Sequence, residues 1–253
     1  MILGVQADEC RSSIVSPDMI RVGTSGFQYP AWRGGFYPAG IDESEMLPFY
    51  AARFDSVEIN YSFYRLPTVP SLLGWAQATP PHFKLALRAP RRITHILHLK
   101  GAAATTNEFL RRATTLGEKL AVVLFQIAPE HELDVAVLGE FLAGLPGETR
   151  AAFEFRNPDW LTDAVFDCLR QYNVALCVSD SDTLRTPALR TADFAYFRLR
   201  DEGYGQADLA RWSAIIREWD ASGSQDIYVY FKHEETGKGP EFAKRLLALL
   251  SQH

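Results

Sequence analysis

The chain has 253 residues, of which 47% are hydrophobic, and its formal net charge is −5. This size and hydrophobic content suffice for one large core, and the acidic balance argues against a basic surface that coats nucleic acid. The apolar runs are all far shorter than the roughly 20 residues of a membrane-spanning helix, so the sequence predicts no membrane partner.

The first residues, 1–18, mix charged residues with serines and lack the apolar centre of a secretory signal. We expect a flexible N-terminal extension over 1–18, followed by one domain over 19–253. The cysteines Cys10, Cys168 and Cys177 have no paired spacing. Such a pattern is typical of buried thiols in a reducing compartment, so the predicted location is the cytoplasm.

Eight short apolar runs follow one another along the chain, and most neighbours are separated by a stretch with helical periodicity. The predicted strands are 20–24, 56–60, 83–88, 121–126, 151–156, 174–180, 195–200 and 227–232. Strands that alternate with helices form parallel βαβ units, and eight such units in about 250 residues match a closed (β/α)8 TIM-like barrel. The segment 181–192 contains Pro187 and lacks a helical stripe. The helix after the sixth strand is therefore predicted to be short or degraded.

Within most of these strands every second residue is apolar and the others are polar or charged. Successive side chains point to opposite faces of a strand, so the apolar set should pack on the helices and the polar set should point into the barrel. The predicted inward set contains Thr24, Glu58, Asn60, Lys84, Arg88, Gln126, Glu154, Arg156, Asp180, Arg198, Arg200, Tyr230 and Lys232. Barrel enzymes place their active sites at the carboxyl ends of the strands. The sequence therefore predicts a polar site at that mouth.

Positive charge exceeds negative charge within this set. Its cations are Lys84, Arg88, Arg156, Arg198, Arg200 and Lys232, and its acids are Glu58, Glu154 and Asp180. A buried charge without a partner costs several kcal/mol, so the surplus predicts an anionic ligand such as a phosphate, a carboxylate or a nucleic-acid backbone. Arg156 and Arg198 are expected to hold the anion, with Lys84 assisting. The alternative is an internal salt-bridge network that only fills the barrel.

The three acids are the candidate catalytic residues. Glu154 is expected to lie beside Arg156 and close to Asp180, and a neighbouring cation keeps a carboxylate ionised. An ionised carboxylate suits a general base or an orienting group. Glu58 could act as the general acid if its surroundings are apolar. Asn60 and Gln126 are expected to orient the ligand through hydrogen bonds.

Aromatic residues gather in the loops that follow several predicted strands. They are Phe27, Tyr29, Trp32, Phe36, Tyr37, Tyr61, Phe63, Tyr64, Trp160 and Tyr204. Such rings stack on bases or sugars, or they bury one another and fold the loops into a lid. We predict ligand contacts for Trp160 and, from the strands and their loops, for Thr24, Arg88, His95, Tyr230 and Lys232.

His95 and His98 have the spacing of a metal-binding pair, but no third ligand follows at a diagnostic offset. We therefore predict no metal cofactor. A mixed zinc site built from Glu154, Asp180 and a loop histidine is the alternative. The surplus of arginines argues against it, because a dication among guanidinium groups is electrostatically unfavourable.

Several ordered motifs resemble one family. They are Gly23–Phe27 with Tyr29 and Trp32, Phe36–Pro38, Val57–Asn60, Phe63–Pro67, Thr94–His95, Phe125–Gln126, Glu154–Arg156 with Trp160, Asp180, and Tyr230–Phe231. Through them the chain resembles the YecE-like family, domain of unknown function 72 (DUF72). The resemblance implies a TIM-like barrel and no particular activity. The chain departs from the family pattern at Arg200-Asp201 and at Lys232-His233, which implies a different or more anionic ligand.

These observations together predict an uncharacterised YecE-like enzyme, hydrolase-like, that acts by acid/base chemistry on a small anionic ligand at the barrel mouth. The ligand is expected to bear a phosphate or to resemble nucleic acid. One alternative is a glycoside-processing enzyme, which would use paired carboxylates and aromatic platforms. The other is a non-catalytic module that binds single-stranded nucleic acid. The sequence has no feature that specifies an oligomeric state.

Overall fold

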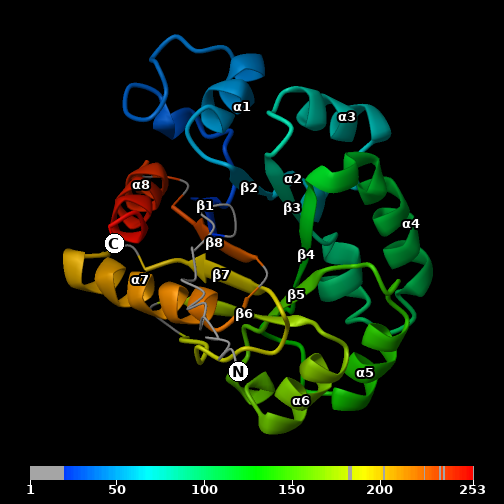
Figure 1. Ribbon diagram of the computed structural model, residues 1–253. Helices are drawn as coiled ribbons and strands as arrows, with labels where there is room; N and C mark the ends of the chain where they lie inside the picture. Colours follow the sequence, from blue (N-terminus) through cyan, green and yellow to red (C-terminus); the bar gives the residue numbers. More distant parts are fainter. Residues whose placement is uncertain are drawn as a thin grey trace, which may run out of the picture.

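The computed structural model describes residues 20–181, 184–201, 203–224, 226–233, 235 and 237–252. Eight parallel strands curl into a barrel that helices surround (Figure 1). The strands are β1 (Ile20–Thr24), β2 (Ser56–Ile59), β3 (Lys84–Arg88), β4 (Leu120–Gln126), β5 (Ala151–Glu154), β6 (Ala175–Asp180), β7 (Ala195–Leu199) and β8 (Ile227–Phe231). The predicted (β/α)8 TIM-like barrel is confirmed. The N-terminal extension expected over 1–18 lies outside the described residues.

Helices connect most successive strands. They are α1 (Glu43–Ala51), α2 (Tyr61–Tyr64), α3 (Val69–Gln77), α4 (Ala103–Ala113), α5 (Val135–Ala143), α6 (Asp163–Gln171), α7 (Gln206–Ala221) and α8 (Lys238–Leu250). Side-chain oxygens of Thr68, Asp134 and Thr162 cap α3, α5 and α6 by accepting backbone N–H bonds. Between β6 and β7 the described residues contain no helix, where a short or degraded helix was predicted. Within the described part of the chain, no helix is long and apolar enough to cross a membrane.

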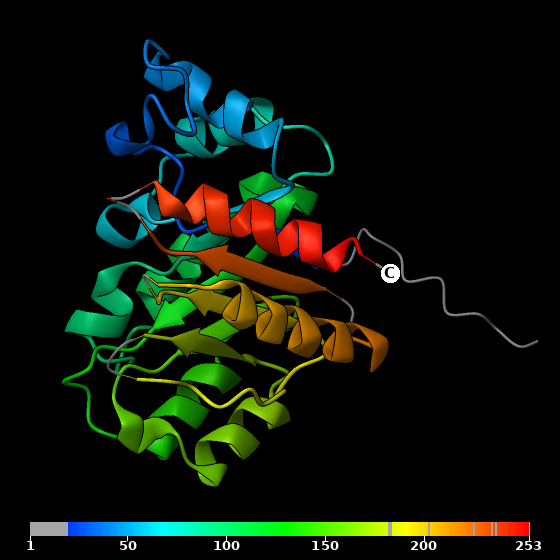
Figure 2. The same cartoon turned by 90° about the vertical axis from the view of Figure 1, so that its left-hand side faces the viewer.

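The sheet runs in the order β1-β8-β7-β6-β5-β4-β3-β2, and each neighbouring pair is parallel. The seam between β1 and β2 closes through one bridge, in which the Gly26 N–H donates to the Glu58 carbonyl at 2.7 Å. This bridge holds the loop after β1 directly at the carboxyl end of β2. Figure 2 shows the strands from the side, with α7 and α8 packed next to each other on the outside of β7 and β8.

The Tyr50 hydroxyl of α1 occupies the open part of this seam. It accepts the Thr24 N–H at 2.8 Å and donates to the Ser56 carbonyl at 3.1 Å. A Cβ atom on Gly23 would lie 2.1 Å from the Ser56 oxygen. Only glycine permits this approach of the two strands, so the barrel closes by side-chain insertion where a backbone ladder is missing.

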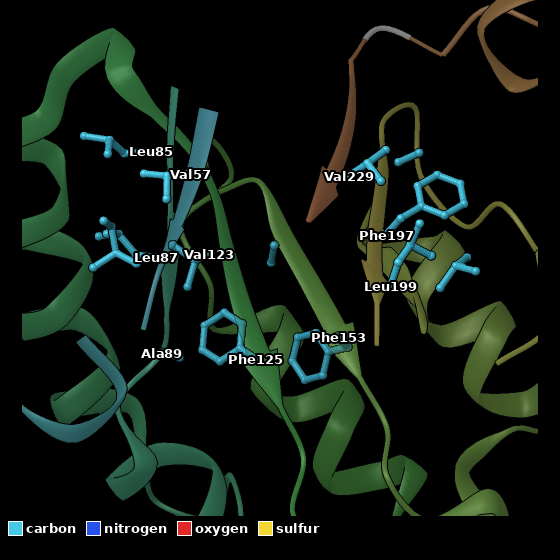
Figure 3. Packing of buried hydrophobic residues seen from close by; sticks show 14 of the residues in the cluster. Val57, Leu85, Leu87, Ala89, Val123, Phe125, Phe153, Phe197, Leu199 and Val229 are labelled. Atoms are coloured by element: carbon cyan, nitrogen blue, oxygen red, sulfur yellow. The ribbon is translucent and has the colours of Figure 1, made fainter. Parts of the chain in front are cut away.

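Two apolar layers flank the barrel wall. The outer layer packs between strands and helices, and Figure 3 shows Leu85, Phe125, Phe153 and Phe197 within it. The inner layer fills the barrel below the mouth with Ala86, Val122, Leu124, Ala152, Cys177, Tyr196 and Tyr230. The predicted division of inward and outward residues is confirmed for β2, β3, β4, β5, β7 and β8.

Two predicted inward residues face outward. Thr24 is paired with Phe231, and its methyl group faces Gly239 of α8. Asp180 is paired with Leu199 and accepts hydrogen bonds from Tyr204 and Trp212. In β1 the inward position before Thr24 is a glycine, and in β6 both faces are apolar. The predictions for Thr24 and Asp180 were therefore one position out of phase.

Candidate active site at the barrel mouth

Seven side chains at the mouth form a closed cycle of hydrogen bonds that we call the polar ring. Its members are Ser25, Glu58, Asn60, Arg88, Gln126, Glu154 and Arg198. They come from the ends of β2, β3, β4, β5 and β7 and from the residue that follows β1. Parallel strands bring these positions to one end of the barrel, so residues distant in sequence meet there.

Arg198 joins the two carboxylates of the ring and is completely buried. Its Nη2 donates to Glu58 Oε1 at 2.8 Å and to Ser25 Oγ at 3.1 Å, while its Nη1 donates to Glu154 Oε2. Removal of two carboxylates from water is favourable only with such charged partners. The charge of Arg198 is therefore matched by two carboxylates, although its buried Nε has no hydrogen-bond partner among the described residues. That Arg198 holds a ligand anion stays a prediction.

Arg88 occupies the opposite side of the ring and has neutral partners. Its Nη2 donates to Gln126 Oε1 at 2.7 Å and its Nη1 to Asn60 Oδ1 at 3.3 Å. Because guanidinium only donates, it fixes both amides with their oxygens toward it. Arg88 is 5% exposed, and its buried Nε has no hydrogen-bond partner among the described residues. Its guanidinium carbon also lies 3.8 Å from the centre of the Phe63 ring.

The charge on Arg88 is poorly compensated. Burial and the repulsion of Arg198 lower the pKa of Arg88 to about 10, although Glu58 and Glu154 partly oppose the shift. The side chain still carries its charge at neutral pH. A buried cation without a carboxylate partner is a favourable binding point for an anion.

Glu58 lies in polar surroundings, contrary to what its suggested role as an acid requires. Burial by itself raises the pKa of Glu58, but the Arg198 charge and the hydrogen bonds from Ser25 and Tyr196 outweigh burial, so the pKa is lowered. Tyr196 supports the carboxylate from the barrel interior with a 2.6 Å hydrogen bond. Glu58 is therefore ionised at neutral pH, and the condition for its role as general acid is not met.

Glu154 is the acceptor for three arginines. Besides Arg198, it accepts Arg156 Nε at 3.5 Å and Arg200 Nη1 at 3.4 Å. Burial opposes ionisation of Glu154, but these three charges and the Gln126 hydrogen bond hold its pKa far below the usual range. The expectation that Glu154 stays ionised agrees with this geometry.

A small cavity opens beside Glu154. It has a volume of about 220 Å³, and its walls include Arg156, Ser179, Leu184 and Arg200. Both arginines are partly exposed, with 30% and 24% of their side-chain surfaces open. Together with Arg88 and Arg198, they place four guanidinium groups around two carboxylates. The positive surplus predicted from the sequence is retained, but Lys84 and Asp180 do not belong to it.

His95 lies next to the Arg88 side of the ring, in a short π-helical turn (Arg92–Ile96). Its imidazole packs edge-to-face on Phe63 at 5.0 Å, and its Nδ1 lies 2.8 Å from the Thr94 hydroxyl. Burial and the nearby Arg88 charge lower the pKa of His95. The ring is therefore neutral at pH 7 and able to accept a proton.

Other predicted ligand residues lie away from this centre. Lys84 begins β3 at the amino end of the barrel and donates to the Glu118 carbonyl at 2.6 Å, so the prediction that it assists at the mouth is wrong. Tyr230 is buried below the ring and shares a hydrogen bond with Ser56. Trp160 is also fully buried, stacked on Phe155. Neither aromatic ring is exposed to a ligand.

Lys232 directly follows β8 and is half-buried, and its backbone N–H donates to the Leu199 carbonyl at 2.9 Å.

Most aromatic residues of the first loop bury one another. Trp32 stacks on Tyr37, and each is 1% exposed. The lid interpretation therefore describes these two residues.

The sequence interpretation missed Ser25 and Tyr196, which both bind Glu58. Tyr196 alternates with Arg198 on β7, so its inward position could have been recognised from the strand pattern. Ser25 follows the predicted strand end, and it shares the parity of Arg21 and Gly23 in β1, which the prediction for Thr24 did not follow. Among the described residues, no group of three His, Cys, Asp or Glu side chains could hold a metal ion. Asp180 faces α7, so it cannot bind a zinc ion together with Glu154 and a loop histidine.

Comparison with known proteins places this barrel in a family. The model of a family described as "Protein of unknown function DUF72" matches residues 21–253. The chain belongs to the DUF72 family. UPF0759 protein YecE of Escherichia coli K12 is 29% identical over 143 residues, which are 56% of this chain and 50% of YecE. The chain thus spans half the length of that relative.

Three further relatives match over most of their length. UPF0759 protein YunF of Bacillus subtilis is 23% identical over 92% of this chain and 95% of its own length. A crystal structure of a DUF72 protein from Thermotoga maritima has a TM-score of 0.84 and 25% identity, covering 92% of this chain and all of the other. A second, from Enterococcus faecalis, has a TM-score of 0.78 at 17% identity. Their names report no activity.

Proposed function

We propose that this DUF72 protein is an enzyme that binds a small phosphate- or carboxylate-bearing ligand at the barrel mouth and acts on it by acid/base chemistry. Arg88, Arg156 and Arg200 are the anion-binding residues in this proposal. The observation that carries it is the charge of Arg88, which is buried, lacks a carboxylate partner in the described chain and keeps an unused Nε donor. A ligand oxyanion supplies the missing countercharge.

The proposal gives the buried carboxylates a positioning role. Glu58 and Glu154 are saturated with donors and stay ionised, so they hold the arginines in place. Proton transfer is assigned to His95, which is neutral, half-buried and close to Arg88. An imidazole in this state can accept a proton from a nucleophile or from the ligand.

The two alternative functions have less support. A glycoside-processing enzyme needs one protonated carboxyl group, but the pKa values of Glu58 and Glu154 are both lowered. A module that binds single-stranded nucleic acid would neutralise many phosphates, so its affinity would fall steeply with salt. Arg88, Arg156 and Arg200 lie together at the barrel mouth, an arrangement that suits a small ligand.

Replacement of Arg88 tests the anion site. In Arg88→Met the affinity for inorganic phosphate, measured by isothermal titration calorimetry, is expected to fall about 10- to 100-fold, because a charged hydrogen bond contributes about 1.5–3 kcal/mol. Arg111→Met is the matched control, since Arg111 lies on the exposed face of α4 and pairs with Glu108. Equal phosphate affinity in wild type and Arg88→Met would contradict the proposal.

The titration of His95 provides a second test. NMR of the imidazole is expected to show a lowered pKa that rises when inorganic phosphate binds, because the anion offsets the Arg88 charge that disfavours imidazolium. His131, whose pKa is lowered by burial, serves as an internal reference in the same spectra. A His95 pKa that phosphate leaves unchanged would remove this residue from the site.

A further inference from the structure

A larger cavity adjoins the polar ring on the side of β1 and β2. Its volume is about 620 Å³, within the usual range for small-molecule sites. Its floor is Phe27 and Ile59, and its walls carry the aromatic side chains Tyr29, Tyr61, Tyr64 and Trp75. The proposed anion site does not account for these rings.

Asn60 connects this cavity with the anion site. Its side chain lines the cavity, its Oδ1 accepts Arg88 Nη1 at 3.3 Å, and its Nδ2 donates to Tyr29 at 3.2 Å. An anion on Arg88 would therefore lie one side chain away from the aromatic walls.

The cavity walls leave aromatic surface open to solvent. Tyr61 is 48% exposed and Tyr64 is 69% exposed, and both rank among the most exposed large hydrophobic side chains of the described chain. The Tyr61 ring contacts Trp75 edge-to-face at 6.2 Å. Exposed rings around a cavity are typical of a binding site for an apolar or planar group.

The part of the cavity wall formed by α3 includes a glycine, which has no side chain. Gly74 lies within the helix, where glycine is unfavourable, and a Cβ at this position would have open space around it. The missing side chain leaves room in the cavity beside Trp75. A side chain at position 74 would therefore begin in open space at the cavity wall.

We infer that this cavity binds the planar aromatic or heteroaromatic ring of a small ligand whose anionic group is held by Arg88. The inference rests on the proposed function for the anion and adds the chemical class of the remaining part. Stacking against tyrosine and tryptophan provides the ring's binding energy. The Asn60 amide, the Ser71 hydroxyl and the Gln28 amide line the same cavity and can form hydrogen bonds with a heteroaromatic edge.

The test compares phenyl phosphate with methyl phosphate and inorganic phosphate by calorimetry on the whole chain. Phenyl phosphate is expected to bind wild type about tenfold more tightly than methyl phosphate. In Gly74→Leu, which places a side chain in the cavity beside Trp75, and in Tyr64→Ser, which removes an exposed ring, this ratio should fall toward one. The affinity for inorganic phosphate should stay unchanged in both variants, and Gly74→Ala is the matched control.

The outcomes separate the two proposals. Equal binding of phenyl and methyl phosphate by wild type would overturn the aromatic subsite and leave the anion site standing. A preference for phenyl phosphate that survives in both Gly74→Leu and Tyr64→Ser would also overturn it, because the ring would bind elsewhere. Failure of all three phosphates to bind would overturn the proposed function and, with it, this inference.

Discussion

Arg198→Met is expected to destabilise the fold by about 3–5 kcal/mol, the range for breaking a buried ion pair by removing one partner. The substitution leaves the carboxylates of Glu58 and Glu154 buried at 0% and 1% exposure without the cation that they share. Methionine keeps the apolar stem of arginine, so the lost guanidinium group is the main change. Urea denaturation followed by circular dichroism measures the free energy of unfolding.

The effect should depend on the remaining carboxylates. In the triple variant with Arg198→Met, Glu58→Gln and Glu154→Gln, part of the lost stability should return, because neither buried carboxylate is then left without its cation. Arg111→Met provides the matched control: its side chain is 68% exposed, so its loss should change stability by no more than about 0.5 kcal/mol. A cost below about 1 kcal/mol for Arg198→Met would show that the carboxylates are not held by this cation.

Glu154→Gln is expected to lower stability by about 3–5 kcal/mol at neutral pH, because Arg198, Arg156 and Arg200 lose their common acceptor. The loss should also depend on pH. The pKa of Glu154 is lowered in the folded state, so the unfolded chain binds its proton first. The stabilisation is fully present above the unfolded value of 4.5 and is lost as the pH falls through the folded value.

The difference in unfolding free energy between wild type and Glu154→Gln should therefore shrink when the pH falls from about 7 to about 3. Denaturation curves at these two pH values measure it. Glu108→Gln is the matched control, because Glu108 pairs with Arg111 and Arg112 on an exposed helix face, where water and salt weaken ion pairs. If wild type and Glu154→Gln differ in unfolding free energy by the same amount at both pH values, the pKa of Glu154 is not lowered in the folded state.

These two predictions follow from the separation of roles within the polar ring. One side, around Arg198, is internally neutralised and belongs to the structure of the barrel. The other side, around Arg88, has neutral hydrogen-bond partners and excess charge. Because Gln126 bridges the two sides through Arg88 and Glu154, the same cycle of hydrogen bonds positions the anion-binding side against a rigid support.

The sequence by itself determined the succession of strands and helices along the chain, the barrel class, and which side chains of most strands point into the barrel. Strict alternation, as at Glu58 between Val57 and Ile59, leaves only one way to bury the apolar residues in a two-faced strand. The same reasoning placed Gln126, Glu154 and Arg198 inside the barrel. Local pattern sufficed there, because burial is a property of each strand.

Only the tertiary structure decided which charges meet. Asp180 and Thr24 face outward because Ser179 and Gly23 hold the inward positions next to them, and Lys84 lies at the opposite end of the barrel from Arg88. The pairing of Arg198 with both glutamates, and the lack of such a pair at Arg88, depends on the register between strands far apart in sequence. Distances across the barrel set the electrostatic balance of the mouth, and no local pattern encodes them.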